Sequence, residues 1–306
     1  MTIAFISHHD CEKHDVGDAH PERPARLRAI HDHLIATGLD IALRHYNAPK
    51  ATKAQLMRVH DADYVESVFK KSPKEGIIWL DPDTGMVPDT LNAALRAAGA
   101  AVMGAELVCR GEEHQAFCAV RPPGHHAEHN RAMGFCLFNN IAVGVAHAHE
   151  ALGMERIAIV DFDVHHGNGT EDIFRNEERV LLCCSFRHPY YPFTGAETQS
   201  NHIINVPLEG GTEGTVFRKM VAEKWLPALY AFKPQILFIS AGFDAHAADD
   251  MGGLRLVESD YQWVTAELKK VMLEYGEGRI VSMLEGGYEL GALARSVAAH
   301  LNGMLD

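Results

Sequence analysis

The chain of 306 residues is long for one domain, but an α/β fold of this size often has a single core, and 47% hydrophobic residues is ordinary for a globular protein. The net charge of −13 argues against nucleic acid as a partner, because binding its phosphate backbone requires clustered Lys and Arg, and it suits a cationic substrate. No window reaches the apolar length of a membrane helix, and the stretch 1–6 is too short for a signal peptide, so we expect a cytoplasmic protein with no membrane partner.

In the first half of the chain, short apolar runs alternate with amphipathic segments. Residues 1–6 are expected to form the first strand. Pro24 opens a helix that stops near Gly38, and Asp89 is expected to cap a long Ala-rich helix at 90–109. The other predicted elements here are a helix at 55–70, an irregular loop at 71–88, a strand at 115–120 and a loop at 121–127.

The second half alternates more regularly, with predicted helices at about 139–152, 170–175, 212–232, 259–275 and 290–305, and predicted strands at 156–160, 180–185, 202–206, 235–240 and 279–284. His147 and His149 are assigned to the surface of the first of these helices. The six cysteines show no C-x-x-C pair and are expected to be reduced core thiols. Alternating strands and helices predict one α/β domain over 1–306, with a mostly parallel sheet covered on both faces.

Four ionisable residues follow the apolar strand at 157–160, namely Asp161, Asp163, His165 and His166. Such residues are costly in a buried strand unless they are paired or bound to a metal ion. If the extended conformation persists, its period of two places Asp161, Asp163 and His165 on one side and His166 on the other. The stretch therefore predicts a strand that delivers ligands.

Polar clusters follow four predicted strands, at 121–129, 161–168, 241–246 and 285–288. The carboxyl ends of strands in an open α/β sheet are where ligands bind, so we expect these distant segments to meet at one edge. A catalytic zinc ion needs three nitrogen or oxygen ligands and one open position. Asp163, His165 and Asp244 could supply the three ligands.

Two further residue types in these clusters suit acyl transfer to water. The adjacent imidazoles of His125 and His126 offer a base for a water molecule, whose pKa a zinc ion lowers towards ~7. Tyr288 follows two glycines, and its hydroxyl could donate to the oxyanion of a tetrahedral intermediate. A packed tyrosine with a satisfied hydroxyl explains that segment equally well by itself.

Several motifs in order resemble the histone deacetylase family, and they occupy 20–24, 121–127, 134–136, 161–170, 240–244 and 285–288. The resemblance implies the three-layer arginase-like α/β fold and one zinc ion, or Fe²⁺, held by Asp163, His165 and Asp244. It also implies that His126 is the general base and His125 its electrostatic partner. Asp161 and Asn168 would orient the two imidazoles at their outer nitrogens. Tyr288 would polarise the acyl carbonyl. Asn168 and Glu285 are similar to the class II branch.

The resemblance extends to the substrate tunnel and to a second ion. Two aromatic residues are similar to the tunnel walls: Phe135, next to Gly134, and, in the aromatic loop at 187–200, most clearly Tyr191. Asp81 or Asp83 is similar to an aspartate at the rim. A structural K⁺ site is implied at Asp161, Asp163, His165, Ser185 and Phe186.

These residues predict hydrolysis of an acetyl or other short acyl group from a lysine side chain in a protein or peptide. An acetylpolyamine is the alternative substrate, although Met251 stands where the eukaryotic polyamine branch carries a glutamate. A non-catalytic acyl-lysine-binding module and an arginase-type enzyme with two metal ions are further alternatives, and counting the bound metal ions would separate the last from the deacetylase. The sequence leaves the oligomeric state open.

Overall fold

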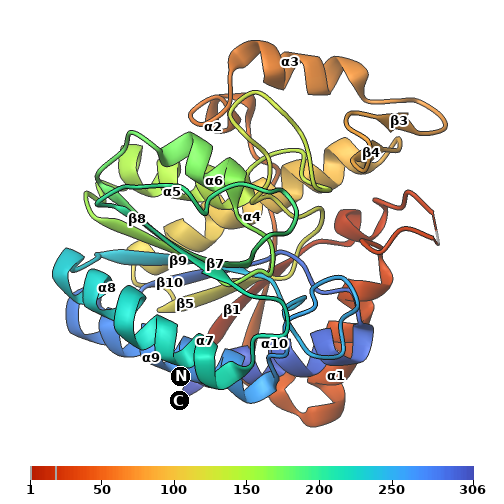
Figure 1. Ribbon diagram of the computed structural model, residues 1–306. Helices are drawn as coiled ribbons and strands as arrows, with labels where there is room; N and C mark the ends of the chain where they lie inside the picture. The colour runs from red at the N-terminus through yellow and green to blue at the C-terminus, as the bar shows by residue number, and fades with distance from the viewer. Residues whose placement is uncertain (1, 18) are drawn as a thin grey trace.

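A single sheet of eight strands, every neighbouring pair parallel, forms the centre of the protein, as a computed structural model of residues 2–17 and 19–306 shows (Figure 1). The strand order is β2-β1-β5-β10-β9-β6-β7-β8. The strands are β1 (Ile3–Ser7), β2 (Leu43–Asn47), β5 (Gln115–Cys118), β6 (Ile157–Asp161), β7 (Val180–Arg187), β8 (Ile203–Leu208), β9 (Ile236–Ala241) and β10 (Ile280–Leu284). Met1, which we assigned to the first strand, lies outside the described residues.

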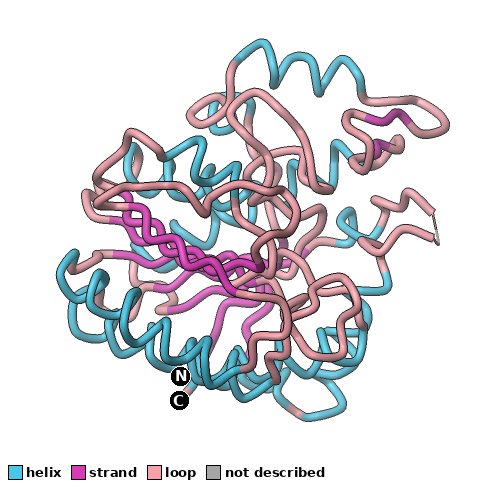
Figure 2. Tube along the Cα trace, in the orientation of Figure 1, coloured by secondary structure: helices cyan, strands magenta, loops and turns pink. Residues whose placement is uncertain are grey.

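Helices cover both faces of this sheet, which confirms the predicted α/β fold in three layers (Figures 1 and 2). The helices α4, α5 and α6 lie on one face, and α1, α7, α8, α9 and α10 lie on the other. Their bounds, with those of two short outer helices, are α1 (Ala25–Thr37), α2 (Lys53–Leu56), α3 (Ala62–Lys71), α4 (Thr90–Cys109), α5 (Asn140–Glu150), α6 (Asn168–Phe174), α7 (Gly214–Met220), α8 (Leu226–Phe232), α9 (Glu258–Tyr275) and α10 (Leu290–Leu305). Because both faces are covered, all residues of β6, β9 and β10 are buried.

The predicted helix at 55–70 is wrong, because the chain breaks there into α2 and α3. His60 lies in the break and is buried. Its Nδ1 lies 2.9 Å from the carbonyl oxygen of Glu128, and its Nε2 accepts a hydrogen bond from the backbone N–H of Asn139 at 2.9 Å. These contacts attach the break to the 128–139 segment, and a long-range attachment of this kind overrides the local helical pattern.

Other boundaries also differ from the prediction. The loop expected at 71–88 contains an antiparallel hairpin, β3 (Ile78–Trp79) and β4 (Gly85–Met86), and β2 was not predicted. A π-helical turn, Val221–Trp225, interrupts the helix expected at 212–232. Asp89 precedes α4 but makes no capping hydrogen bond through its side chain. His147 is buried rather than on the surface, because its ring nitrogens contact Arg58 at 2.9 Å and Glu106 at 3.1 Å.

Helix α4 is the one helix in the described residues that is long and apolar enough to cross a membrane, contrary to our expectation that no segment would be. Length and composition alone give that result, and 72% of its apolar window is buried inside the protein. A Cβ at Gly104 would lie 2.9 Å from Val281, and one at Gly99 would overlap the backbone of Pro49. The small residues of α4 therefore allow close packing against β10 and against the loop that follows β2, as in a core helix.

Candidate active site

The three predicted metal ligands lie together at the carboxyl edge of the sheet. Asp163 and His165 follow β6, and Asp244 follows β9, its neighbour in the sheet. One ligand atom from each residue lies within 4.8 Å of the other two, and all three residues are buried. The strand ends at Asp161 rather than continuing to His165, and the backbone N–H groups of residues 163 and 165 instead donate to the carboxylates two residues earlier.

The local structure fits a divalent cation at this position. Oδ2 of Asp244 is buried and accepts no hydrogen bond from any described residue. Gly242 and Gly286 line the carboxylates so closely that a Cβ at Gly286 would overlap Asp244 Oδ2 and lie 2.6 Å from Asp163 Oδ2. Two carboxylates and one imidazole are a ligand set that suits Zn²⁺ or Fe²⁺. Only glycine at these positions leaves room for the ligands and an ion.

Protons compete for the same atoms. Nδ1 of His165 lies 2.9 Å from Asp163 Oδ1 and 3.3 Å from Asp244 Oδ2. Burial alone would lower the pKa of His165, but its interactions with the two nearby carboxylates outweigh burial and raise this pKa to about 9. Burial and Asp163 raise the pKa of Asp244. A cation binding here would therefore displace protons.

Two adjacent imidazoles next to the metal ligands are in opposite electrostatic environments. Nδ1 of His125 lies 2.9 Å from Asp161 Oδ2. Burial alone would lower the pKa of His125, but Asp161 and Asp163 outweigh it and hold this pKa well above its usual value. Burial, His125 and His165 lower the pKa of His126 well below its usual value. The surroundings therefore favour the protonated form of His125 and the neutral form of His126, which is how paired titratable groups divide acid and base roles.

Asn168 sets the tautomer of His126. The Asn168 amide nitrogen donates to Glu128 Oε1 at 2.8 Å, so its Oδ1 faces His126 Nδ1, at 2.7 Å. A carbonyl oxygen only accepts, so Nδ1 of His126 carries the hydrogen and Nε2 carries the lone pair. Asn168 is the first residue of α6 and is buried. The helix thus fixes His126 as a hydrogen-bond acceptor towards the cavity.

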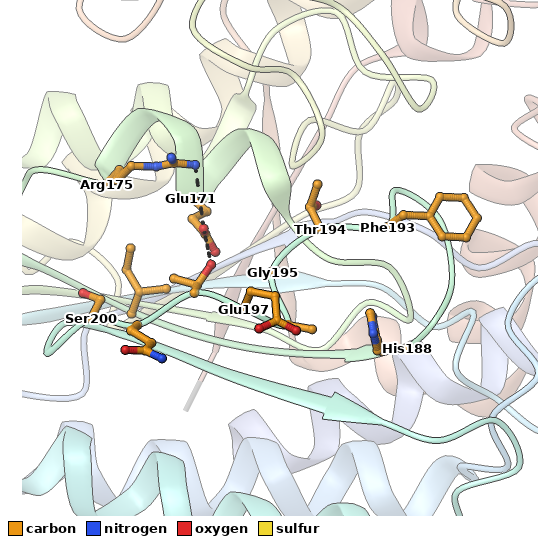
Figure 3. Close-up of a pocket in the computed structure, with 12 residues that line it drawn as sticks. Glu171, Arg175, His188, Phe193, Thr194, Gly195, Glu197 and Ser200 are labelled. Carbon is orange, nitrogen blue, oxygen red and sulfur yellow. Dashed lines mark hydrogen bonds and ion pairs between the residues drawn. The ribbon is translucent and has the colours of Figure 1, made fainter.

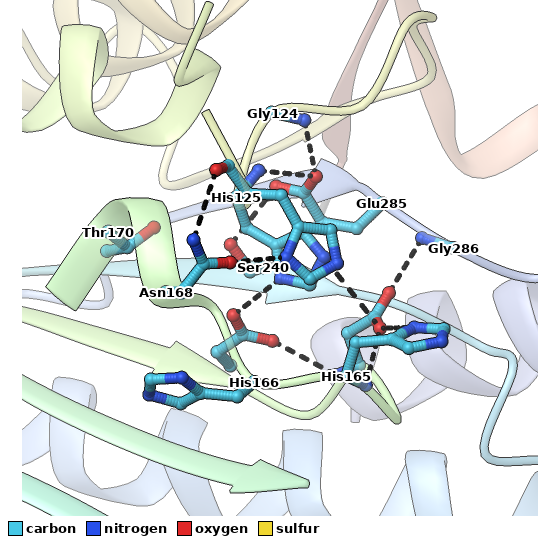
Figure 4. A network of polar contacts seen from close by, with 12 residues as sticks. Gly124, His125, His165, His166, Asn168, Thr170, Ser240, Glu285 and Gly286 are labelled. Carbon is cyan, nitrogen blue, oxygen red and sulfur yellow. Dashed lines mark hydrogen bonds and ion pairs between the residues drawn. The ribbon is translucent and has the colours of Figure 1, made fainter. Parts of the chain in front are cut away.

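Glu285 holds the loop that carries both imidazoles (Figure 4). Its Oε2 accepts hydrogen bonds from the backbone N–H groups of Gly124, at 2.7 Å, and His125, at 3.2 Å, and Ser240 donates to its Oε1 at 3.1 Å. Burial raises the pKa of Glu285 to about 7, although His125 opposes the shift. The loop after β5 is thereby attached to the ends of β9 and β10.

Two residues without a predicted role position Tyr288. Asp249 accepts hydrogen bonds from the backbone N–H groups of Tyr288 and Glu289, at 2.6 and 3.0 Å. The guanidinium of Arg26 donates to the carbonyl oxygens of Gly287 and Glu285, at 2.6 and 2.5 Å, and lies 5.1 Å from the Tyr288 ring. Arg26 belongs to α1, so the sequence near Tyr288 could not reveal it. The structure shows that Arg26 is fully buried, and no local sequence signal indicated this.

These groups surround a cavity of about 220 Å³ lined by Asp83, Pro123, His125, His126, Gly134, Phe135, His165, Tyr190, Tyr191, Met251, Gly286 and Tyr288. The predicted tunnel residues Gly134, Phe135, Tyr191, Met251 and Asp83 are all among them. Asp81 is not, because its carboxylate instead accepts a hydrogen bond from the backbone N–H of Asp83 at 2.9 Å. Pro123, Tyr190 and Gly286 were not predicted to line the cavity.

A larger hollow of about 580 Å³ lies along the 193–200 segment and contains none of the candidate catalytic residues (Figure 3). Beside it, His166 lies 2.9 Å from Glu171 and 2.8 Å from Thr194, which attaches this segment to α6. His166 thus supports the loop of Tyr190 and Tyr191 instead of binding the ion. Ser185 and Phe186 are buried in β7, next to β6, and the K⁺ site there stays a prediction.

Comparison with known proteins gives one consistent result. The model of a family described as histone deacetylase domain matches residues 20–304. Type-2 histone deacetylase 2 from Dictyostelium discoideum is 34% identical over the whole chain, which spans only 21% of that protein. Histone deacetylase-like amidohydrolase from Pseudomonas aeruginosa is 35% identical over 88% of the chain and 72% of its own length. The crystal structure of the HDA15 HD domain superposes with a TM-score of 0.93 at 34% identity, covering all of this chain and 90% of that one.

Proposed function

The chain belongs to the histone deacetylase family, and on that basis we propose that it hydrolyses the amide of an acetylated, or otherwise short-acylated, lysine side chain in a protein or peptide. One observation carries the proposal. His125, His126 and Tyr288 line the same narrow cavity as His165, which forms the metal-ligand group with Asp163 and Asp244, and the surroundings of the two adjacent imidazoles shift their pKa values in opposite directions. Family membership and these filled positions support a hydrolytic deacetylase over a non-catalytic binding module.

The residues divide the reaction between them. A Zn²⁺ or Fe²⁺ ion on Asp163, His165 and Asp244 would supply a Lewis acid for the carbonyl and for water. His126 Nε2 accepts the proton of the attacking water, and the Tyr288 hydroxyl donates to the carbonyl oxygen as it becomes an oxyanion. Collapse of the tetrahedral intermediate breaks the C–N bond, and an imidazolium gives its proton to the leaving amine. The products are a carboxylic acid, acetate in the simplest case, and a free amine.

Substrate turnover tests this proposal directly. Acetyl-lysine peptides should be hydrolysed with higher kcat/KM than N-acetylputrescine or N-acetylspermidine. Met251 at the cavity wall offers no charge to a second ammonium group, which favours the peptide. The alternative, an acetylpolyamine, gains support from Asp81 and Asp83, because neither carboxylate forms an ion pair with any described residue. Preference for the polyamines would reverse our assignment of the substrate but not of the reaction.

Metal binding should depend steeply on pH. A metal-free His165 with a pKa of about 9 is protonated at neutral pH, and the proton must leave before the nitrogen can coordinate. The apparent affinity for Zn²⁺ should therefore rise as the pH increases towards about 9 and fall in acid. Competition titrations with a chelator, between pH 6 and pH 9, measure this, and metal analysis at saturation should give one ion per chain. Two ions per chain would favour the dinuclear alternative.

Replacing Asn168 with aspartate should move the acid limb of the pH–rate profile to higher pH. The substitution exchanges a neutral acceptor for an anion at 2.7 Å from His126 Nδ1, and an adjacent negative charge raises the pKa of an imidazole. Because the base must be unprotonated to act, a raised pKa delays the onset of activity. The profile of kcat/KM against pH for the two proteins gives the shift, and an unmoved or lowered acid limb would remove His126 as the titrating base.

We also propose a cytoplasmic location, supported by six free cysteines, five of them buried.

A further inference from the structure

Three consecutive large apolar side chains are exposed on the hairpin beside the active site. Ile77, Ile78 and Trp79, which we call the rim patch, are 44%, 39% and 51% exposed. The other exposed large hydrophobic residues among those described occur singly along the chain, as is usual for a protein surface. A contiguous apolar patch is unusual and commonly marks an interaction site.

The hairpin is fixed to the wall of the catalytic cavity. Oδ1 of Asp83 accepts a hydrogen bond from the backbone N–H of Gly134, and Thr84 Oγ1 accepts one from Phe135, both at 3.1 Å. Gly134 and Phe135 line the cavity, as does Asp83 itself. Trp79 precedes Asp83 by four residues, which at most span about 14 Å of extended chain. The rim patch is therefore held within the length of a short peptide from the cavity.

A hollow of about 510 Å³ continues from the same two segments. Its lining includes Leu80, next to Trp79, and Arg131 and Ala132, which lead directly to Gly134. Tyr64 of α3 also lines the hollow, and Val68, although it contributes to the lining, is buried. The hollow and the catalytic cavity are thus built on the same two chain segments, 80–83 and 130–135, and the rim patch directly precedes the first of them, so we treat the three as one candidate surface.

We propose that this surface binds the polypeptide flanking the acylated lysine, with a bulky apolar residue within about four positions of that lysine. The inference rests on the proposed function and refines its substrate class. An extended peptide advances about 3.3 Å per residue, so a side chain three or four positions from a lysine seated in the cavity reaches the rim patch. An acetylpolyamine has no side chain to place there, whereas a polypeptide can use both the apolar patch and the hollow.

The test measures KM for three substrates with the unaltered protein and with the Trp79→Ser variant. The substrates are a doubly capped acetyl-lysine, a heptapeptide with central acetyl-lysine and leucine at three positions on either side, and the same peptide with serine for both leucines. We expect the unaltered protein to have a lower KM for the leucine peptide than for the serine peptide. Trp79→Ser should raise the KM for the leucine peptide by roughly tenfold, the scale of losing part of one buried aromatic contact, and leave the capped lysine unchanged.

Controls separate this inference from the proposed function. Leu273→Ser removes an exposed apolar side chain of α9, on the opposite face of the sheet, and should change no KM. Equal KM values for the two peptides in both proteins would overturn the inference while turnover of the capped lysine still supports a deacetylase. Loss of self-association in Trp79→Ser, with unchanged peptide KM, would also overturn it, because the patch would then contact a second copy. If none of the three substrates is turned over, the proposed function is contradicted. The peptide-binding surface would still be supported if fluorescence anisotropy showed that the protein binds the leucine peptide and that Trp79→Ser weakens this binding.

Discussion

Replacing Gly286 with alanine is expected to remove metal binding and hydrolysis together. A Cβ at this position would overlap Oδ2 of Asp244 and lie 2.6 Å from Oδ2 of Asp163, so two of the three ligands must move. The backbone N–H of Gly286 also donates to Asp163 Oδ2 at 2.9 Å, which leaves the main chain little room to withdraw. Displacements of this kind cost on the order of 100-fold in activity or metal affinity. Metal content after dialysis and turnover of an acetyl-lysine peptide measure the two losses.

A second glycine gives the matched control. Gly291 lies five residues further on, exposed in the first turn of α10, where an added Cβ would meet only the movable ends of Arg295 and Glu289, at 3.2 Å and beyond. Gly291→Ala should keep its metal and its activity, because alanine favours an exposed helix. A Gly286→Ala protein that bound one ion with unchanged affinity would show that the glycine does not shape the ion site. Circular dichroism of both variants separates a local effect from misfolding.

The ion site could be predicted because its ligands directly follow strands that are recognisable in the sequence. An apolar run followed by Asp161, Asp163 and His165 indicates a buried strand that reaches a site, and parallel strands bring such ends to one edge. Asp244 could thus be placed near residues some eighty positions away, and the structure brings the three ligands together. One detail differs: β6 ends at Asp161, so a bend after the strand presents His165.

The unpredicted features depend on contacts between distant parts of the chain. Arg26 donates a hydrogen bond to the carbonyl oxygen of Gly287, 261 residues away, and the local pattern of α1 does not indicate this contact. The break between α2 and α3 follows from His60 bonding to the 128–139 segment, although 55–70 alone has a helical pattern. His147 was assigned to the surface of its helix, yet Glu106 and Arg58 contact both its ring nitrogens in a buried position.

Replacing Tyr288 with phenylalanine is expected to lower kcat by about 10²- to 10³-fold, the usual loss when one donor to an oxyanion is removed. The ring should stay in place, because Asp249 holds the backbone at residue 288 and Arg26 and Phe135 contact the ring face and edge. Burial and Asp244 hold the pKa of the Tyr288 hydroxyl well above its usual value, so it carries its proton throughout the neutral range. The hydroxyl thus acts as a donor and not as a base.

This electrostatic role predicts which kinetic parameter changes. The oxyanion develops only as water adds to the carbonyl, so the hydrogen bond from Tyr288 is stronger in the transition state than with bound substrate. Tyr288→Phe should therefore lower kcat and kcat/KM by similar factors and leave KM and metal content nearly unchanged. Tyr191→Phe removes a hydroxyl from the same cavity, one that has no hydrogen-bond partner among the described residues, and serves as the matched control. If the two variants lost activity equally, or if Tyr288→Phe retained full kcat, the tyrosine hydroxyl could not be the group that stabilises the oxyanion.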